Sequence, residues 1–139
     1  MVIDEPKTVW RRHETIQECT SSLRGVQDAL YVLNGKWKLL IIISLNEGPK
    51  RFRELQRQVN GITAKVLSKE LKELEINEFI TRNVYLTTPV TIEYELTEYS
   101  ATLQPVIDAL SNWGNQHRKR ITGKDSTKKE DEVEVSMSM

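Results

Sequence analysis

Residues 52–77 read FRELQRQVNGITAKVLSKELKELEIN, and this stretch decides the fold. Its first eight residues place apolar side chains three and four positions apart, which is typical of a short amphipathic helix of about two turns. Asn60-Gly61 is a turn dipeptide, and the hydroxyl of Thr63 can cap a longer helix that runs to about Asn77. A short helix, a turn and a longer helix in immediate succession predict a helix-turn-helix.

The longer helix has two chemically different faces. At about 100° per residue, Leu67, Leu71 and Leu74 fall on one side. The opposite side carries four polar residues and no acid, and we call these residues the lysine stripe: Lys65, Ser68, Lys69 and Lys72. Because the leucines require a core, the stripe is expected to face outward. Such a face suits DNA phosphates and base edges in a major groove, although a solvated lysine face that binds nothing is the alternative.

Charge is distributed unevenly along a chain that is neutral as a whole. The sequence has 20 basic and 20 acidic side chains, so its net charge identifies no partner. Between Lys50 and Arg82, however, eight basic side chains face five acidic ones, whereas from Lys124 onward three face five. The positive charge is therefore concentrated around the predicted helix-turn-helix, and a DNA affinity that depends strongly on salt is expected.

Two further helices are predicted before this motif. Apolar residues recur with helical spacing over 23–33, and Asn34-Gly35 ends that helix because glycine can adopt the left-handed conformation of a helix end. A second helix is expected to begin near Lys36. It carries apolar residues on most sides as far as Leu45, so we expect it to be largely buried.

A hairpin and a last helix are predicted after the motif. Residues 90–96 alternate apolar and polar side chains, which indicates a half-buried strand. Residues 80–85 form a weaker strand candidate, and 86–89 suit a hairpin loop. Helical periodicity returns beyond 97, where Pro105 either kinks the helix or belongs to its first turn. The fold class is thus α+β, a mainly helical winged helix-turn-helix with a two- to three-stranded β-wing and terminal dimerisation helices.

The same patterns divide the chain into four segments. From residue 123 onward apolar residues nearly vanish, and Lys, Asp, Glu and Ser dominate, which is typical of disorder. The expected segments are an N-terminal arm at 1–22, a winged helix-turn-helix DNA-binding domain at 23–96, a C-terminal dimerisation helix at 97–122 and a disordered tail at 123–139.

An ordered set of short motifs extends over residues 19 to 118. It consists of Gly35-Lys36-Trp37, Gly48-Pro49-Lys50-Arg51-Phe52-Arg53-Glu54-Leu55, Gly61-Ile62-Thr63, Leu67-Ser68, Leu71-Lys72-Glu73-Leu74-Glu75, Pro89-Val90, Glu93-Tyr94-Glu95-Leu96-Thr97 and Trp113-Gly114. This set resembles the HxlR-type winged helix-turn-helix transcriptional regulators. The resemblance implies a bacterial DNA-binding repressor or activator that acts as a homodimer. It also implies a second helix in the major groove, a β-hairpin wing on the flanking backbone and terminal helices that form the dimer.

One departure from that family pattern concerns the end of the long helix. Asn77-Glu78-Phe79-Ile80 stands where a small-residue turn ending in Gly-Leu-Ile is commoner, so the approach to the wing is expected to be shaped differently.

The expected partners are double-stranded DNA, read as a roughly palindromic operator, and a second copy of the chain. The expected DNA-binding residues are Arg51, Arg53, Thr63, Ala64, Lys65, Ser68, Lys69, Lys72, Arg82, Thr87 and Thr88. A single small domain does not easily bury the apolar rows at both ends of the chain, which also favours a dimer. The expected dimer residues are Leu23, Val26, Leu30, Leu103, Val106, Ile107, Leu110 and Trp113.

Cys19 is the only cysteine, so no disulfide can form within one chain, which fits a cytoplasmic location. Some members of the family use a thiol as a redox sensor, but Cys19 lies sixteen residues before Gly35, farther than in many members. A sensor thiol needs a positive charge nearby, and the adjacent Glu18 and Thr20 supply none. A redox role for Cys19 stays open, and we expect none.

Other classes of function have less support. His13 and His117 are too few and too far apart for a metal site, and no cofactor is expected. We find no nucleophile elbow and no phosphate-binding glycine loop, so the chain is not expected to be an enzyme. The longest apolar run, Leu39 to Ile43, is far shorter than the ~20 residues of a membrane span. The remaining alternative is a winged-helix protein–protein interaction module without sequence-specific DNA binding, and no effector is identified.

Overall fold

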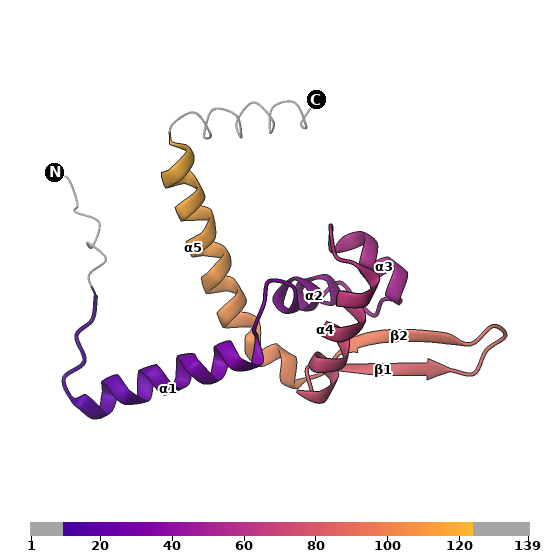
Figure 1. Cartoon of the computed structure of the whole chain (residues 1–139), viewed down its shortest axis with the longest axis horizontal. Coiled ribbons are helices and arrows are strands. Elements are labelled where there is room, and N and C mark those ends of the chain that lie inside the picture. Colours follow the sequence, from indigo (N-terminus) through magenta and orange to yellow (C-terminus); the bar gives the residue numbers. More distant parts are fainter. Residues whose placement is uncertain (1–9, 124–139) are drawn as a thin grey trace. The chain divides into compact units, whose positions relative to one another are not determined.

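The computed structural model describes residues 10–123, which form helices and one antiparallel sheet (Figure 1). In chain order the elements are α1 (Ile16–Val32), α2 (Lys38–Leu45), α3 (Phe52–Gln58), α4 (Ala64–Ile76), β1 (Ile80–Tyr85), β2 (Thr91–Leu96), the 3₁₀ helix η1 (Tyr99–Leu103) and α5 (Gln104–Thr122). They belong to two compact units, one up to Lys36 and one from Trp37 onward. This boundary differs from the predicted boundary between residues 22 and 23.

The first unit contains α1, which begins earlier than the sequence pattern indicates. The Thr15 hydroxyl accepts a hydrogen bond from the backbone N–H of Glu18 at 3.1 Å and so caps a helix that starts at Ile16. The sequence pattern places residues 16–22 in the arm, because their polar side chains have no apolar period. A capped helix whose turns are exposed to solvent does not require an apolar period. Gly35 has a φ of +81°, which confirms its predicted left-handed conformation.

The second unit is built around α2, α3 and α4. Its core consists of aliphatic side chains with almost no solvent exposure, among them Ile41, Leu45, Leu55, Leu67, Leu71 and Leu74. Burial of these side chains is the main favourable term that holds the three helices together. The expectation that α2 is buried on most sides was wrong for Leu40 and Ile43, which are 46% and 47% exposed. The main contacts of α2 are with α3, α4 and β2, and Ile43 lines a concavity together with Ala101 and Ile107.

The predicted turn and cap of the helix-turn-helix are both confirmed. Gly61, in the turn between α3 and α4, has a φ of +91°. Its backbone passes the ring of Trp37, which would lie 3.9 Å from an added Cβ. The Thr63 hydroxyl accepts a hydrogen bond from the backbone N–H of Val66 at 3.2 Å, and α4 begins at the next residue, Ala64.

The end of α4 adopts the conformation that a glycine would give it, although no glycine is present. Glu78 has a φ of +66°. Its backbone N–H donates to the carbonyl of Glu75 at 3.0 Å, and that of Phe79 donates to the carbonyl of Leu74 at 2.9 Å. These two bonds form a Schellman motif, which normally has glycine at the left-handed position. The expectation of a differently shaped approach to the wing is therefore corrected, because the turn keeps its usual form at the cost of strain.

The wing is a two-stranded antiparallel sheet in which β1 pairs with β2 from Ile80↔Leu96 to Tyr85↔Thr91. A third strand is reduced to one bridge, in which Lys50 and Tyr94 exchange backbone hydrogen bonds of 3.0 and 2.8 Å. The hairpin extends beyond α3 and α4 (Figure 1). The clean alternation expected of the second strand is not seen, because most of β2 is half-buried on both faces.

After the wing the chain passes through η1 into α5. Pro105 lies in the first turn of α5, which decides between the two predicted positions. Leu103 lies in η1 and is only 8% exposed, so it belongs to the core of its own chain. This corrects its assignment to the dimer surface. The predicted disordered tail lies, apart from Gly123, outside the described residues. No helix within residues 10–123 is long and apolar enough to cross a membrane.

Candidate nucleic-acid interface

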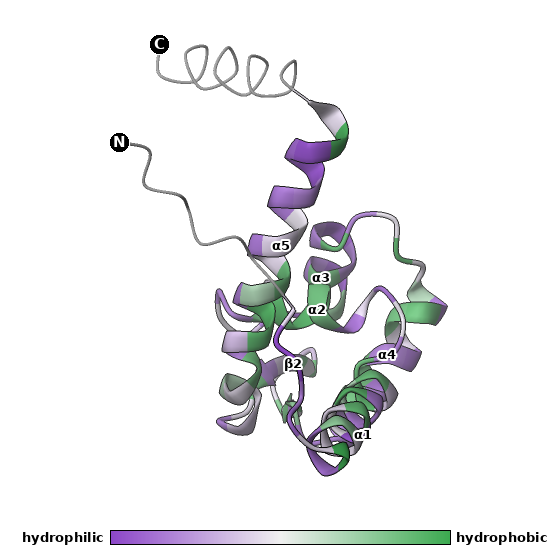
Figure 2. Cartoon of the chain, turned by 90° about the vertical axis from the view of Figure 1, so that its left-hand side faces the viewer, coloured by the Kyte–Doolittle hydropathy of each residue, from purple (hydrophilic) through white to green (hydrophobic). Residues whose placement is uncertain are grey.

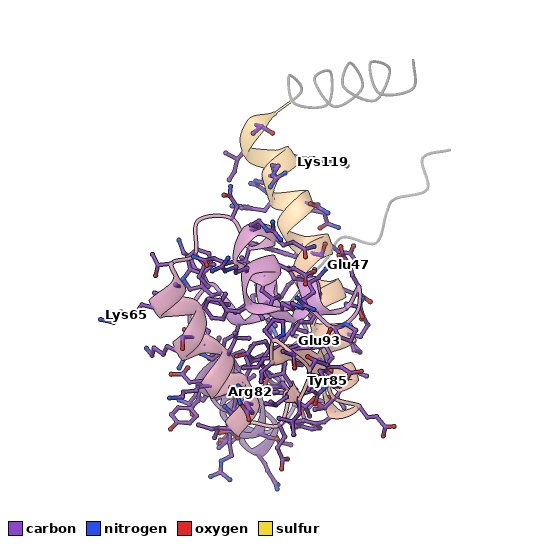
Figure 3. All side chains as sticks on the ribbon, turned by 90° about the vertical axis from the view of Figure 1, so that its right-hand side faces the viewer. Glu47, Lys65, Arg82, Tyr85, Glu93 and Lys119 are labelled. Atoms are coloured by element: carbon purple, nitrogen blue, oxygen red, sulfur yellow. The ribbon has the colours of Figure 1, made fainter. Side chains whose placement is uncertain are left out.

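The lysine stripe lies on the solvent side of α4, opposite the buried leucines. All four of its residues are exposed, whereas Leu67, Leu71 and Leu74 are enclosed in the core. Lys65 projects away from the body of the second unit (Figure 3). The chain therefore does not cover this face with its own described residues. A stripe covered by the chain itself would instead favour the alternative of a protein–protein interaction module.

A concavity between α4 and the wing brings together residues that are far apart in the sequence. It has a volume of about 410 Å³ and is lined by Ser68, Leu71, Lys72, Glu75, Arg82 and Tyr94. Arg82 on β1 and Lys72 on α4 thus contribute two positive charges to one surface, with Tyr94 of β2 beside them. Tyr94 was not predicted as a site residue, because only the cross-strand pairing of β1 with β2 places it next to Arg82.

A second basic surface belongs to α3. Arg51 precedes the first residue of this helix and Arg53 is its second residue, and both are exposed. Arg53 lines a concavity of about 660 Å³ together with Gln56, Arg57 and Ile62. Arg57 was missed in the sequence, although it lies four positions after Arg53 and so shares its helix face.

The two threonines of the wing loop differ in what they can offer. The Thr87 hydroxyl donates to the carbonyl of Pro89 at 2.7 Å and lies 3.1 Å from the hydroxyl of Thr91. It therefore stabilises the loop and has no hydrogen left to donate to a phosphate. Thr88 is exposed. Neither threonine lines the concavity between α4 and the wing.

A buried network of ion pairs connects α2 to the core side of α4. The ammonium of Lys38, at the first residue of α2, is 1% exposed and lies 2.7 Å from Glu70 Oε2 and 2.5 Å from Glu73 Oε2. Burial by itself would lower the pKa of Lys38, but the hydrogen bonds and charges of Glu70 and Glu73 outweigh it and raise that pKa above 10.5. The hydrogen bond from Lys38 lowers the pKa of Glu73 below 4.5.

Both pKa shifts favour the charged forms at neutral pH. A raised lysine pKa gives stability that is lost only as the pH rises through the folded-state value, above 10.5. A lowered glutamate pKa gives stability that is lost only as the pH falls below 4.5. Between these limits Lys38 and Glu73 are both ionised. Sequence reasoning missed the network, although Glu70 stands three residues after Leu67, where the leucine face calls for an apolar residue.

Glu73 connects this network to the lysine stripe. Its Oε1 lies 4.0 Å from the ammonium of Lys69, which is 71% exposed. One carboxylate is therefore shared between a buried lysine and a lysine of the candidate interface.

The residues expected at a dimer interface are mostly exposed. On α1, Leu23, Val26 and Leu30 present apolar surface. On α5, Val106, Leu110 and Trp113 do the same, and Ile107 is half-buried. Hydrophobic segments of α5 gather in its first half, and hydrophilic ones predominate in its second half apart from a hydrophobic segment near the C-terminal end (Figure 2). The Trp113 ring stacks on His117 with centroids 4.8 Å apart. Because Trp113 is exposed, it is not a core residue.

Cys19 lies on α1 with an exposed free thiol. No group of His, Cys, Asp and Glu that could hold a metal ion occurs among residues 10–123.

Comparison with known proteins reveals a consistent set of relatives. The HxlR-like helix-turn-helix family model matches residues 32–122. The HTH-type transcriptional regulator YtcD of Bacillus subtilis is 42% identical over 99 residues, which are 71% of this chain and 79% of YtcD.

Solved structures agree with this result. The reduced form of the redox regulator HypR superposes with a TM-score of 0.66 at 36% identity, over 70% of this chain and 97% of HypR. The reduced form of the transcriptional regulator YodB of B. subtilis superposes with a TM-score of 0.59 at 41% identity, over 65% of this chain and 88% of YodB.

Proposed function

The chain belongs to the HxlR-like helix-turn-helix family of transcriptional regulators, and from this premise we propose how it binds DNA. The lysine stripe of α4 enters the major groove of a double-stranded operator. Arg82 of the wing and Arg51 and Arg53 of α3 hold the flanking phosphates. We propose a role in transcriptional regulation and no catalytic activity. The chain acts in the cytoplasm of a bacterial cell, where chromosomal DNA lies.

One observation carries this proposal. The lysine stripe is exposed and contains no acid, and its members Ser68 and Lys72 line the concavity between α4 and the wing together with Arg82. A helix-turn-helix places its second helix in the groove with the helix N-terminus near the bases. Thr63 and Ala64, at that N-terminus, are therefore assigned to the DNA surface together with the stripe.

The assembly that we propose is a homodimer. The exposed apolar residues of α1 and α5 offer surface for a second copy, and a twofold dimer presents two recognition helices to a palindromic operator. Leu103 is left out of this interface for the reason given above. In the proposed dimer, α1 and α5 of one copy pack against α1 and α5 of the other.

The proposal is tested by removing the charge of the stripe. Operator duplexes are first selected from a random-sequence pool with the native chain, and binding is then measured by fluorescence anisotropy at several salt concentrations. We expect the triple variant Lys65→Ala, Lys69→Ala and Lys72→Ala to bind the selected duplex more weakly. The slope of log K against log salt should also become shallower by about one unit for each lost phosphate contact.

The matched control is Lys119→Ala, which removes one exposed lysine from the last turn of α5. It should leave both affinity and salt slope unchanged. If the triple variant binds the selected duplex like the native chain, α4 is not the groove-binding helix.

A further inference from the structure

The buried Lys38 has no part in the proposed DNA contacts, yet its position connects it with them. Its ammonium lies between two carboxylates of α4 and is shielded from solvent. A lysine enclosed in this way is costly unless it is paired, and the two carboxylates favour its charged form. The pairing crosses from α2 to α4, between residues that are more than thirty positions apart in the sequence.

The charges around Lys38 do not balance within the network. One ammonium faces two carboxylates, so the Lys38–Glu70–Glu73 group carries one net negative charge. That charge is accessible at Glu73, whose side chain is partly exposed and whose Oε1 points toward Lys69. At 4.0 Å the Glu73–Lys69 pair is at the limit of an ion pair, while the Lys38–Glu73 contact is a short hydrogen bond.

When DNA is present, Glu73 and a DNA phosphate compete for the ammonium of Lys69. It can approach Glu73 on its own helix, or it can extend toward a phosphate. The Coulomb attraction of Glu73 for Lys69 is weakened when Lys38 already neutralises that carboxylate. We propose that Lys38 is a positioning residue for DNA binding: by pairing with the Glu73 carboxylate, it leaves Lys69 available to a phosphate.

This inference rests on the proposed function, because it requires that Lys69 face DNA. It predicts effects of opposite sign for two residues of one network. Loss of Lys38 frees Glu73 to capture Lys69 and weakens DNA binding. Loss of the Glu73 charge releases Lys69 and strengthens binding. A network that only stabilises the fold gives no gain of affinity in either case.

The first measurement uses Glu73→Gln, which keeps the buried Lys38–Glu70 pair and changes a partly exposed side chain. We expect it to bind the selected operator duplex up to about fivefold more tightly than the native chain, which corresponds to the upper end for one exposed ion pair. Equal or weaker binding by a folded Glu73→Gln variant overturns the proposal.

The second measurement uses the double variant Lys38→Met and Glu70→Gln. It removes the buried cation without leaving a buried unpaired carboxylate, so the fold is kept, as thermal unfolding and circular dichroism check. Among residues 10–123, Lys69 is then the ion-pair partner that remains for the Glu73 carboxylate. We expect up to about fivefold weaker binding and a salt slope shallower by about one unit. Adding Glu73→Gln to this double variant should restore both values.

The role of Lys69 separates the two proposals. If Lys69→Gln weakens binding in the native chain but the double variant binds like the native chain, the inference about Lys38 fails and the assignment of α4 to the groove stands. If Lys69→Gln has no effect, Lys69 does not contact DNA and the inference about Lys38 fails, whereas the assignment of α4 to the groove is decided by the triple variant. In a Lys69→Gln background the double variant should cause no further loss of affinity, and a further loss would contradict the inference.

Discussion

The only thiol of the chain illustrates how a single residue depends on its immediate charges. Cys19 is exposed on α1, so reagents can reach it. Its neighbour Glu18 is acidic, and the Glu18 carboxylate accepts the backbone N–H of Glu14 at 2.9 Å, which keeps a negative charge near this part of the helix. A reactive thiolate needs positive charge in its surroundings. Arg11, Arg12 and His13 line a concavity with Glu18 and Ser22, but Cys19 is not among its lining residues, which favours an ordinary, unreactive cysteine.

We therefore predict that Cys19→Ser changes neither DNA affinity nor the response of that affinity to a mild oxidant such as diamide. Fluorescence anisotropy with and without oxidant, on native and variant protein, is the measurement. Because each chain has one cysteine, a disulfide could form only between two copies or with a small thiol. Oxidant-induced release of DNA by the native chain that disappears in Cys19→Ser would establish a redox switch.

At the scale of the element, the end of α4 and the start of the wing are joined by a strained turn. Glu78 occupies the left-handed conformation that L-residues adopt at a cost of about 1–2 kcal/mol, whereas glycine adopts it freely. The turn is still held firmly, because the Thr97 hydroxyl donates to the carbonyl of Glu78 at 2.6 Å. The wing therefore keeps its attachment to α4 despite the strain.

Glu78→Gly should raise the free energy of unfolding by about 0.5–1 kcal/mol, since the relief of strain exceeds the larger entropy that glycine loses on folding. Urea denaturation measures the change. Glu78→Ala is the control, because it removes the carboxylate but keeps the Cβ, and it should give no such gain. A gain of equal size in both variants would mean that the charge, and not the backbone conformation, is responsible.

Sequence patterns predict those elements whose information is local. The spacing of Leu67, Leu71 and Leu74 predicts both the helix and its buried face, and Thr63 marks its first turn. Local patterns fail where the stabilising partner is distant. Nothing near Lys38 in the sequence indicates that it pairs with Glu70, because only the packing of α2 on α4 brings the two together.

The same reasoning separates the parts of the candidate interface. The exposure of the stripe follows from the helical period alone. In contrast, the proximity of Arg82 to Lys72 and the inclusion of Tyr94 depend on how the wing folds beside α4, which no single segment encodes. The use of the Thr87 hydroxyl within its own loop is likewise a property of the folded hairpin.

At the scale of the whole molecule, apolar surface remains that neither unit covers by itself. Leu110 and Trp113 on α5 are 52% and 63% exposed, and the apolar residues of α1 are also exposed. Exposed apolar residues that are contiguous on a helix favour an interface. Burial of such a row against a second copy is the simplest way to remove it from water.

We predict that the native chain is a dimer at tens of micromolar and that Leu110→Glu shifts it to the monomer, because a carboxylate at the centre of an apolar interface is costly to bury. Sedimentation equilibrium measures the mass of the species. Asn112→Glu is the control, since it adds the same charge at an exposed position nearly opposite Leu110 on α5 and should leave the dimer intact. A native chain that sediments as a monomer would contradict the proposed assembly.

The buried Lys38 also has a consequence for the inheritance of this sequence. A mutation that replaces Lys38 alone leaves Glu70 buried without its cation, and breaking a buried pair in this way costs roughly 3–5 kcal/mol. That is a large part of the about 5–15 kcal/mol that keeps a small domain folded. Exposed residues of the stripe can be exchanged one at a time, so that operator preference can drift between descendants. Positions 38 and 70, in contrast, must be inherited or replaced together. Operator preference can therefore change more easily in this lineage than the buried ion pair that joins α2 to α4.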